Sequence, residues 1–391
     1  MADNRIQVAR RVDAIEPFRV MEMVKAAASM TRAGQDVISM SVGEPDFTAP
    51  DIVARAAVEA IQRGATQYTE SLGLPALREA ISAHYARAYG LAIEPQRIVV
   101  TAGASAGLLL ACAALVADGD EVLMPDPSYP CNRHFVAATG ATARLVPTTP
   151  ASRFQLDAAA VRTHWQPQTR GVLLATPSNP TGTSIAPDEL ARIVDVVRGH
   201  GGIAIVDEIY QGLSYDPAFE RCALALGDDI VSVNSFSKYF SMTGWRLGWL
   251  VLPEALVEPV ERLAQNLYIC ASSVAQHAAI AAFDAESLAE CEIRRDAFRK
   301  RRDFIVPALQ KLGLDVPVIP DGAFYVWADC RRFATDSWDF AMQLMRTAHV
   351  ALTPGKDFGP AHASTYFRLS FATALSQLEE TVRRLERELV R

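Results

Sequence analysis

Short runs of apolar residues, separated by stretches with helical spacing, fill the middle of the chain between residues 97 and 251. Such runs are typical of buried strands, and they occur at 97–103, 121–126, 143–147, 171–177, 203–208, 230–236 and 246–252. The stretch 187–202 starts with Pro187 and ends at Gly201 and Gly202, which is typical of a helix. The alternation predicts an α/β fold, a mainly parallel seven-stranded sheet with helices on both faces.

The two ends of the chain have a different pattern. Residues 18–35 are expected to form a helix and 37–42 a short strand. After residue 285 the pattern predicts, in order, a helix at 285–313, a strand at 323–329, a helix at 337–350, a strand at 365–372 and a final helix. We therefore expect a large α/β domain at 48–285 and a smaller α+β domain built from 1–47 and 286–391.

Composition and charge narrow the class of protein. Of 391 residues, 50% are hydrophobic and 21% are charged, as in a globular protein. The net charge is −7 and Lys and Arg form no dense run, which argues against a nucleic-acid partner. The six Cys include no CxxC and the seven His no HExxH, so neither a disulfide framework nor a metal site is expected. Residues 1–17 include no apolar leader, and the longest apolar run, 108–117, is far shorter than the roughly 20 residues of a membrane span, so we expect a cytoplasmic protein with no membrane partner.

Polar residues follow three of the predicted strands at their carboxyl ends. They are Asn179, Asp207, Tyr210, Ser235, Ser237 and Lys238. Because ligands of open α/β sheets bind at the carboxyl ends of the strands, we expect these side chains to converge on one crevice.

Lys238 is the most unusual of these residues. Its neighbours are aromatic or small, and no acidic residue lies within eight positions on either side. Burial without an acidic partner lowers the pKa of a lysine, and a neutral amine can form a Schiff base. The alternative is a surface lysine with its amine in solvent.

Asp207 ends an apolar strand, where a buried carboxylate needs a partner. The protonated ring nitrogen of pyridoxal 5'-phosphate (PLP) would serve as that partner. The alternative is an aspartate that caps the helix after the strand.

Two further segments carry candidate anion sites. The turn at Gly103, Ala104 and Ser105 comes before a helical stretch, where free N–H groups suit a phosphate, and Arg246 could be a second phosphate ligand. The turn matches neither GxxxxGK[ST] nor GxGxxG, and small residues there are also typical of tight packing. Arg368 interrupts an apolar strand, so its guanidinium needs an anion, either a substrate α-carboxylate or an internal Asp or Glu.

Four segments together resemble the fold-type I PLP-dependent aminotransferases of class I/II, the aspartate aminotransferase-like family. They are SNPTG at 178–182, DEIY at 207–210, SFSKYFSMTGWRLGW at 235–249 and the strand around Arg368. The resemblance extends from SVGEPDF at 41–47 to YFRLSFA at 366–372. It implies fold type I, in which a smaller domain accompanies the PLP-binding sheet domain.

The resemblance also implies a role for each matching residue. Lys238 would carry PLP as a Schiff base, Asp207 would pair with its ring nitrogen, and Tyr210 and Asn179 would hold its phenolic oxygen. The phosphate ligands would be Gly103, Ala104, Ser105, Ser235, Ser237 and Arg246, with Tyr68 from the neighbouring subunit of a homodimer. Tyr129 would stack on the ring, and Gly43, Asn179 and Arg368 would bind the substrate carboxylate. For Tyr68 and Tyr129, ordinary packing is the alternative.

The implied activity is amino transfer from an L-amino acid to a 2-oxo acid by a ping-pong mechanism, with Lys238 as general base. The side-chain preference is not fixed by these motifs. GASAG at 103–107 has no lysine to meet a second carboxylate, and Phe18 and Tyr325 near the expected pocket favour neutral or aromatic substrates.

Three other functions remain open from the sequence. A β-lyase or related elimination enzyme of the same fold would hold PLP in the same way. A PLP-binding regulator would need a winged helix fused to this fold. A Rossmann oxidoreductase would need the GxGxxG that the chain lacks.

Overall fold

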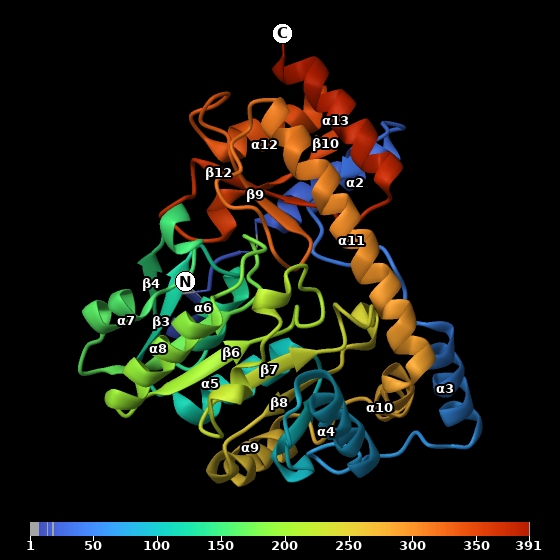
Figure 1. Cartoon of the computed structure of the whole chain (residues 1–391), viewed down its shortest axis with the longest axis vertical. Coiled ribbons are helices and arrows are strands. Elements are labelled where there is room, and N and C mark those ends of the chain that lie inside the picture. The colour runs from blue at the N-terminus through green and yellow to red at the C-terminus, as the bar shows by residue number, and fades with distance from the viewer. Residues whose placement is uncertain (1–7, 14, 18, 391) are drawn as a thin grey trace, which may run out of the picture.

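A seven-stranded sheet forms the centre of the molecule. The computed structural model describes residues 8–13, 15–17 and 19–390, and Figure 1 shows its elements. Across the sheet the strand order is β2, β8, β7, β6, β5, β3, β4. The strands are β2 (Ile98–Thr101), β3 (Glu121–Asp126), β4 (Thr142–Pro147), β5 (Thr169–Ala175), β6 (Ile203–Asp207), β7 (Val231–Ser235) and β8 (Gly248–Val251). β8 alone runs against the direction of the other six strands, so the expected mainly parallel α/β sheet is confirmed.

Helices cover both faces of this sheet, because successive side chains of a strand point to opposite sides. Met124 and Leu173 pack in one core cluster with α5, α6 and α9, whereas Leu123 and Leu174 pack in another with α7 and α8. The helices are α5 (Ala104–Leu115), α6 (Pro130–Ala137), α9 (Glu254–Leu267), α7 (Ala158–His164) and α8 (Pro187–Gly199). The sheet is thus the middle of three layers.

Two smaller sheets lie outside this sandwich. β11 (Thr353–Pro354), β12 (Tyr366–Ser370) and β9 (Tyr325–Asp329) form an antiparallel sheet, and β1 (Ile38–Ser39) pairs in parallel with β10 (Val350–Ala351). The β1–β10 pairing brings the N-terminal and C-terminal parts of the chain side by side, as Figure 1 shows. The domain boundaries at residues 48 and 285 stay a prediction.

The remaining helices surround the smaller sheets or lie beside the β2 end of the large sheet, where α4 (Pro75–Tyr89) packs against β2. The others are α1 (Arg10–Asp13), α2 (Val20–Arg32), α3 (Asp51–Gln62), α10 (Ser273–Ile280), α11 (Ala285–Lys311), α12 (Ser337–Thr347) and α13 (Leu375–Leu389). In Figure 1, α11 runs from the side of α3 and α10 to α13, so it links the two halves of the molecule. No helix within the described ranges combines the length and apolar character needed to cross a bilayer.

Candidate functional site

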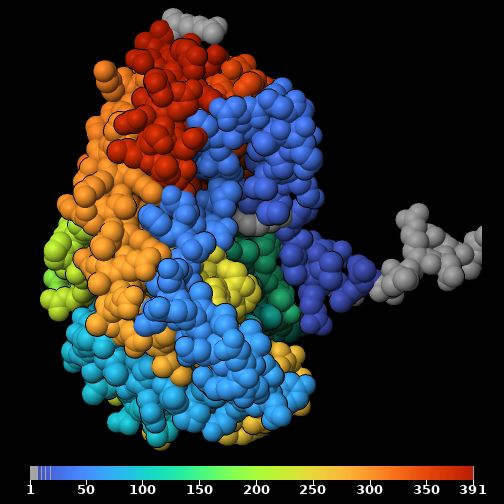
Figure 2. All heavy atoms as spheres, turned by 90° about the vertical axis from the view of Figure 1, so that its right-hand side faces the viewer, coloured from blue at the N-terminus to red at the C-terminus, as the bar shows by residue number. Residues whose placement is uncertain are grey.

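A cavity of about 280 Å³ lies at the carboxyl ends of β5, β6 and β7. Figure 2 shows a side of the molecule on which the yellow segment after β7 is visible in a hollow beside the blue N-terminal segments. Most of the expected site residues line the cavity, namely Gly43, Ala104, Ser105, Tyr129, Asn179, Asp207, Tyr210, Ser235, Ser237, Lys238, Arg246 and Arg368. The strand-end side chains therefore converge on one crevice, as the alternation of strands and helices predicts.

The amine of Lys238 lies inside this cavity and not in solvent. Its Nζ donates a hydrogen bond to the carbonyl oxygen of Gly43 at 2.6 Å. The centroids of the Tyr210 and Phe324 rings lie 5.8 and 5.9 Å from Nζ. Burial, followed by the positive charge of Arg368, lowers the pKa of Lys238 to about 8. At pH 7 roughly a tenth of the amine is thus neutral and nucleophilic, far more than for a free lysine with a pKa near 10.4.

Asp207 ends β6 with its carboxylate buried, and only 3% of its surface is exposed. Its Oδ1 accepts a hydrogen bond from the backbone N–H of Ile209 in the turn after β6, and no helix begins between β6 and Pro217, so the helix-capping alternative is wrong. Burial is the main reason that the pKa of Asp207 is raised to about 7, and the nearby Glu208 adds to the effect. No cation among the described residues forms an ion pair with Asp207. A cation in the cavity would satisfy this carboxylate.

Two tyrosines meet between Lys238 and the smaller sheet. The hydroxyl groups of Tyr210 and Tyr325 are hydrogen-bonded at 2.8 Å. Burial raises the pKa of both phenols, so both stay protonated; one hydrogen joins the two hydroxyl groups and the other remains available to donate. A Cβ on Gly43 would come within 2.6 Å of the Tyr325 hydroxyl, so only glycine allows the close approach of this loop. Tyr325 thus lines the cavity as expected, whereas Phe18 lies outside the described residues.

Arg368 is buried on β12 and its guanidinium faces oxygen atoms that carry no full charge. Nη1 donates to Asn179 Oδ1 at 2.8 Å, and Nη2 donates to the carbonyl oxygen of Ser41 at 2.6 Å and to Thr353 Oγ1 at 3.3 Å. Its Nε has no hydrogen-bond partner within the described chain. The sequence left two partners open for Arg368, a substrate α-carboxylate or an internal Asp or Glu. Among the described residues no Asp or Glu forms an ion pair with it. The geometry favours an external carboxylate.

The phosphate candidates lie where α5 begins. Gly103 precedes α5 with a φ of +83°, and a Cβ there would lie 2.7 Å from the guanidinium of Arg246. Arg246 itself has a φ of 52°, a left-handed conformation that is costly for a residue with a Cβ and is enriched at functional sites. Ala104 and Ser105 line the cavity. Gly103 does not line it, but it leaves room for the guanidinium of Arg246, which packs against it. Free N–H groups and a guanidinium here form a site for a dianion.

Tyr68 stands apart from the other expected site residues. It does not line the cavity of its own chain, and 79% of its surface is exposed. Its expected contact with a neighbouring subunit stays a prediction.

Several residues of the site had no recognised signal in the sequence. Ser41 and Thr353 accept hydrogen bonds from Arg368; Thr353 begins β11 and Ser41 lies just after β1, and no site role was predicted for either residue. Glu208 is fully buried behind Asp207 and accepts hydrogen bonds from Ser232 Oγ at 2.6 Å and from Ala223 N at 2.8 Å. The sequence predicts a helix at 18–35, but only the structure shows that apolar residues of α2 line the cavity.

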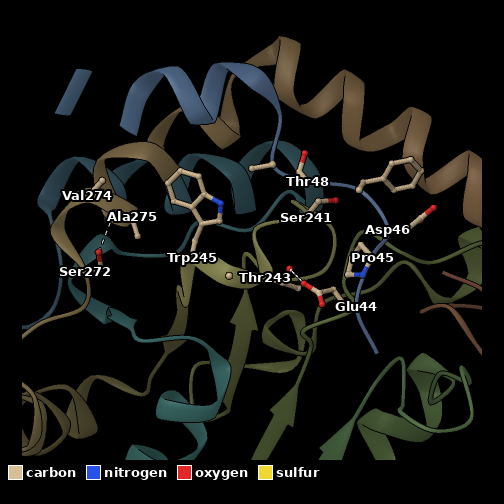
Figure 3. Close-up of a pocket in the computed structure, with 13 residues that line it drawn as sticks. Glu44, Pro45, Asp46, Thr48, Ser241, Thr243, Trp245, Ser272, Val274 and Ala275 are labelled. Carbon is tan, nitrogen blue, oxygen red and sulfur yellow. Dashed lines mark hydrogen bonds between the residues drawn. The ribbon is translucent and has the colours of Figure 1, made fainter. Parts of the chain in front are cut away.

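A second, open hollow of about 550 Å³ adjoins the cavity, and Thr243 lines both. Figure 3 shows Thr243 hydrogen-bonded to Glu44 and the indole of Trp245 next to Thr243, with Val274 and Ala275 beyond it. The larger hollow is shallow and outward-facing, whereas the cavity around Lys238 is lined by buried polar groups. The chemistry of the smaller cavity makes it the candidate active site.

Comparisons with known proteins agree with this arrangement. A sequence model of the family described as aminotransferase class I and II matches residues 35–385. The chain is 40% identical over 372 residues to a valine–pyruvate aminotransferase of Mycobacterium tuberculosis, covering 95% of this chain and 96% of that one. It is similar to the crystal structure of an aminotransferase from Mycobacterium tuberculosis, with a TM-score of 0.95, 40% identity and coverage of 99% and 100% of the two chains. It is also similar to the aspartate aminotransferase from Thermus thermophilus with maleate, with a TM-score of 0.93, 32% identity and coverage of 98% and 100%.

Proposed function

The chain belongs to the class I and class II aminotransferases, which are PLP-dependent enzymes, and we propose that Lys238 is the residue that holds the cofactor. The enzyme moves an amino group between an amino acid and a 2-oxo acid. One observation carries the residue assignment. Lys238, Asp207 and Arg368 line a single cavity, and none of the three has an ion-pair partner in the described part of the chain.

The residues of the cavity fit PLP group by group. The amine of Lys238 suits the aldehyde, and the unpaired carboxylate of Asp207 suits a protonated ring nitrogen. The start of α5 and the guanidinium of Arg246 suit the phosphate, together with the hydroxyl groups of Ser235 and Ser237. Tyr129 lines the cavity, where it could stack on the ring. When bound, PLP supplies an electron sink for the bond broken at the substrate Cα.

In this arrangement Lys238 acts as the general base. Its Nζ, with a pKa lowered to about 8, accepts the proton from the substrate Cα and gives a proton back within the same half-reaction. Asp207 keeps a negative charge at the ring-nitrogen end of the cavity, because a cation there would bring its pKa back down from about 7. The hydroxyl groups of Tyr210 and Tyr325 stay hydrogen-bonded to each other, which leaves one hydrogen of the pair to donate into the cavity.

Arg368 orients the substrate through its α-carboxylate. Asn179, Ser41 and Thr353 fix the plane of the guanidinium, so a carboxylate meets two donors in a set direction. Because Gly43 has no Cβ, its backbone can lie close to Arg368 and to a carboxylate bound there. Both substrates, the amino acid and the 2-oxo acid, carry an α-carboxylate, so one site serves both half-reactions and predicts ping-pong kinetics.

We also propose a homodimer with shared active sites. The support is the open hollow of Figure 3, which shares Thr243 with the cavity and contains the apolar surface of Trp245 and Val274. Tyr68 is free to contact another molecule, and Ile269 is exposed as well. A cytoplasmic location stays a prediction.

An absorbance spectrum of the purified protein tests the proposed function. We expect a near-visible band that an amino acid bleaches and that a 2-oxo acid restores, which would show two separate half-reactions. A protein with no such band after incubation with PLP would contradict the cofactor assignment. Release of pyruvate and ammonia from a cysteine-like substrate without any 2-oxo acid acceptor would instead support a lyase.

A further inference from the structure

Glu208 is a buried carboxylate that has no part in the chemistry described so far. It follows Asp207 directly, yet it does not line the cavity, and only 1% of its surface is exposed. Its own chain therefore encloses it, and a second subunit cannot contact it. Burial raises the pKa of Glu208, while hydrogen bonds from Ser232 and Ala223 oppose that shift. A buried carboxylate costs free energy unless donors surround it, so these donors are part of its role.

Four neutral donors fill the two oxygens of this carboxylate. Oε2 accepts from Ser232 Oγ at 2.6 Å and from Cys222 Sγ at 3.5 Å. Oε1 accepts from the backbone N–H of Ala223 at 2.8 Å and from Gln211 Nε2 at 3.4 Å. An ionised carboxylate has about four acceptor sites, so this set uses them all. Ser232 lies on β7 and Ala223 begins a short 3₁₀ helix, so Glu208 joins the end of β6 to both segments.

The anchored side chain of Glu208 controls how Asp207 faces the cavity. The backbone N–H of Glu208 donates to the carbonyl oxygen of Val233 on β7 at 2.8 Å, so the extended pairing of β6 with β7 continues through this residue. Successive side chains of an extended segment point to opposite sides, so Asp207 faces the cavity while Glu208 faces away from it. Within the described chain the Asp207 carboxylate accepts only the backbone N–H of Ile209. Its direction therefore depends on the backbone that Glu208 fixes from behind.

The same anchor reaches the serines that are assigned to the phosphate. Gln211, which donates to Glu208, accepts from Asn234 Nδ2 through its Oε1 at 2.9 Å. Asn234 Oδ1 accepts the backbone N–H of Ser235 at 2.8 Å, and Ser235 Oγ accepts the backbone N–H of Ser237 at 3.0 Å. We call these five residues the Glu208 network. It connects the turn after Asp207 to the segment that carries Lys238, beside which Ser237 lies.

We propose that Glu208 is a positioning residue for the cofactor. Through the Glu208 network it holds the carboxylate of Asp207 and the phosphate-binding groups of Ser235 and Ser237 in one fixed arrangement. The inference rests on the proposed function, since it takes these residues as ligands of PLP. Glu208 touches neither the cofactor nor the substrate, so it acts only through its neighbours. Two ends of a rigid ligand bind together only where the protein fixes their separation beforehand, which is what a buried hydrogen-bond network provides.

Binding of pyridoxamine 5'-phosphate provides the first test. This amine form of the cofactor cannot form a Schiff base with Lys238, so its Kd reports on the fit of the cavity without turnover. Glu208→Gln keeps the volume but replaces an acceptor oxygen by a donor, and it should raise the Kd roughly tenfold. Ser232→Ala removes a single donor and should raise it about threefold, which keeps the test decisive if Glu208→Gln fails to fold. An unchanged Kd in the folded variants would overturn the inference. If the unsubstituted protein binds no pyridoxamine 5'-phosphate, the proposed function fails instead.

Hydrogen exchange in the full chain without cofactor tests the network itself. Glu208→Gln should speed exchange at the amides of Ile209, Ser235 and Ser237. Asn234→Ala interrupts the network between its two ends, so it should speed exchange at the two serines and leave Ile209 unchanged. The double variant should raise the Kd by less than the product of the two single effects, because both changes break one network. Effects that multiply, together with unchanged exchange at the serines in Glu208→Gln, would contradict the network.

Glu121→Gln is the matched control. Glu121 is another buried carboxylate, 6% exposed, that accepts from Thr169 Oγ1 at 2.9 Å and from Arg144 Nη1 at 3.4 Å. It begins β3, so it lies at the opposite edge of the sheet from the cavity. The control should lower the melting temperature, as Glu208→Gln does, but leave the Kd for pyridoxamine 5'-phosphate unchanged. An equal loss of binding in both variants would mean that general destabilisation weakens binding and that Glu208 does not position the cofactor site.

Discussion

The two sides of the active-site cavity differ in chemistry and in how the chain builds them. On the side of the large sheet, Asp207 ends strand β6 and Lys238 comes shortly after β7, so the charged groups of the lining stand at strand ends. On the side of α2, the lining is apolar, and the helix start is capped by Asp357 from the other end of the chain. In the proposed function the first side holds the groups that every substrate needs, whereas α2 offers the cavity only apolar contacts. Changes on the two sides should therefore have different kinetic signatures.

The largest effect should come from Lys238→Ala. Loss of the amine removes both the cofactor link and the general base, so turnover should fall by roughly 10³-fold or more for every amino donor. Steady-state rates with valine and aspartate measure it. Lys300→Ala on the exposed surface of α11, where the lysine pairs only with Asp296 in the described structure, is the control and should keep full activity. Substantial activity in the Lys238 variant would refute the assignment of the base.

Arg368→Lys should have the next largest effect, at the point where the two sides meet. A lysine cannot keep the contacts to Asn179 and Ser41 while facing a carboxylate in a set plane. Loss of a hydrogen bond to a charged group costs about 1.5–3 kcal/mol, so KM should rise roughly ten- to a hundredfold for all amino acids alike.

Arg262→Lys, in an exposed pair with Glu258, is the control for the Arg368 exchange. It should leave KM unchanged. A fall in kcat with an unchanged KM in the Arg368 variant would show that Arg368 does not bind the substrate.

A pH profile should sharpen the assignment of Lys238. Its pKa in the folded protein is lowered to about 8 by burial and by Arg368, below the roughly 10.4 of a free lysine. Only the neutral amine attacks an aldehyde, so the rate of PLP capture by the apoprotein should rise roughly tenfold per pH unit below about pH 8 and level off above it. Stopped-flow absorbance measures this rate. A rate that still climbs at about pH 10 would indicate an ordinary lysine.

The smallest effect should come from Met21→Ala. Met21 is half-exposed, so shortening it should weaken contact with a leucine side chain by about 1 kcal/mol, a several-fold fall in kcat/KM. Reaction with alanine, whose side chain is too short to reach α2, is the internal control and should change little. An equal fall for leucine and alanine would show that Met21 affects the chemistry common to all donors and not the contact with the substrate side chain.

Prediction from the sequence succeeded where the signal was local. The seven apolar runs predicted the seven strands of the large sheet. The polar residues that follow these strands, such as Asp207 and Lys238, predicted the crevice, because the carboxyl ends of parallel strands meet at one edge of the sheet. The helices α2, α11 and α12 were also expected near their observed positions. By contrast, β10 and β11 have only two residues each, too few for an alternating pattern to be detected.

The sequence by itself determined the α/β fold and the set of chemical groups at Asn179, Asp207, Tyr210 and Lys238, because each follows a strand whose pattern is complete within a few residues. Only the tertiary structure decided that Arg368 faces a cavity instead of an internal carboxylate, and that Asp357 caps α2. Both depend on contacts between residues far apart in the sequence. Arg368 and Asn179 are 189 positions apart, and Asp357 and Arg19 are 338 positions apart. The physical reason is that a buried charge can be satisfied by any suitable group that folding brings near it, and periodicity along the chain holds no record of which group that is.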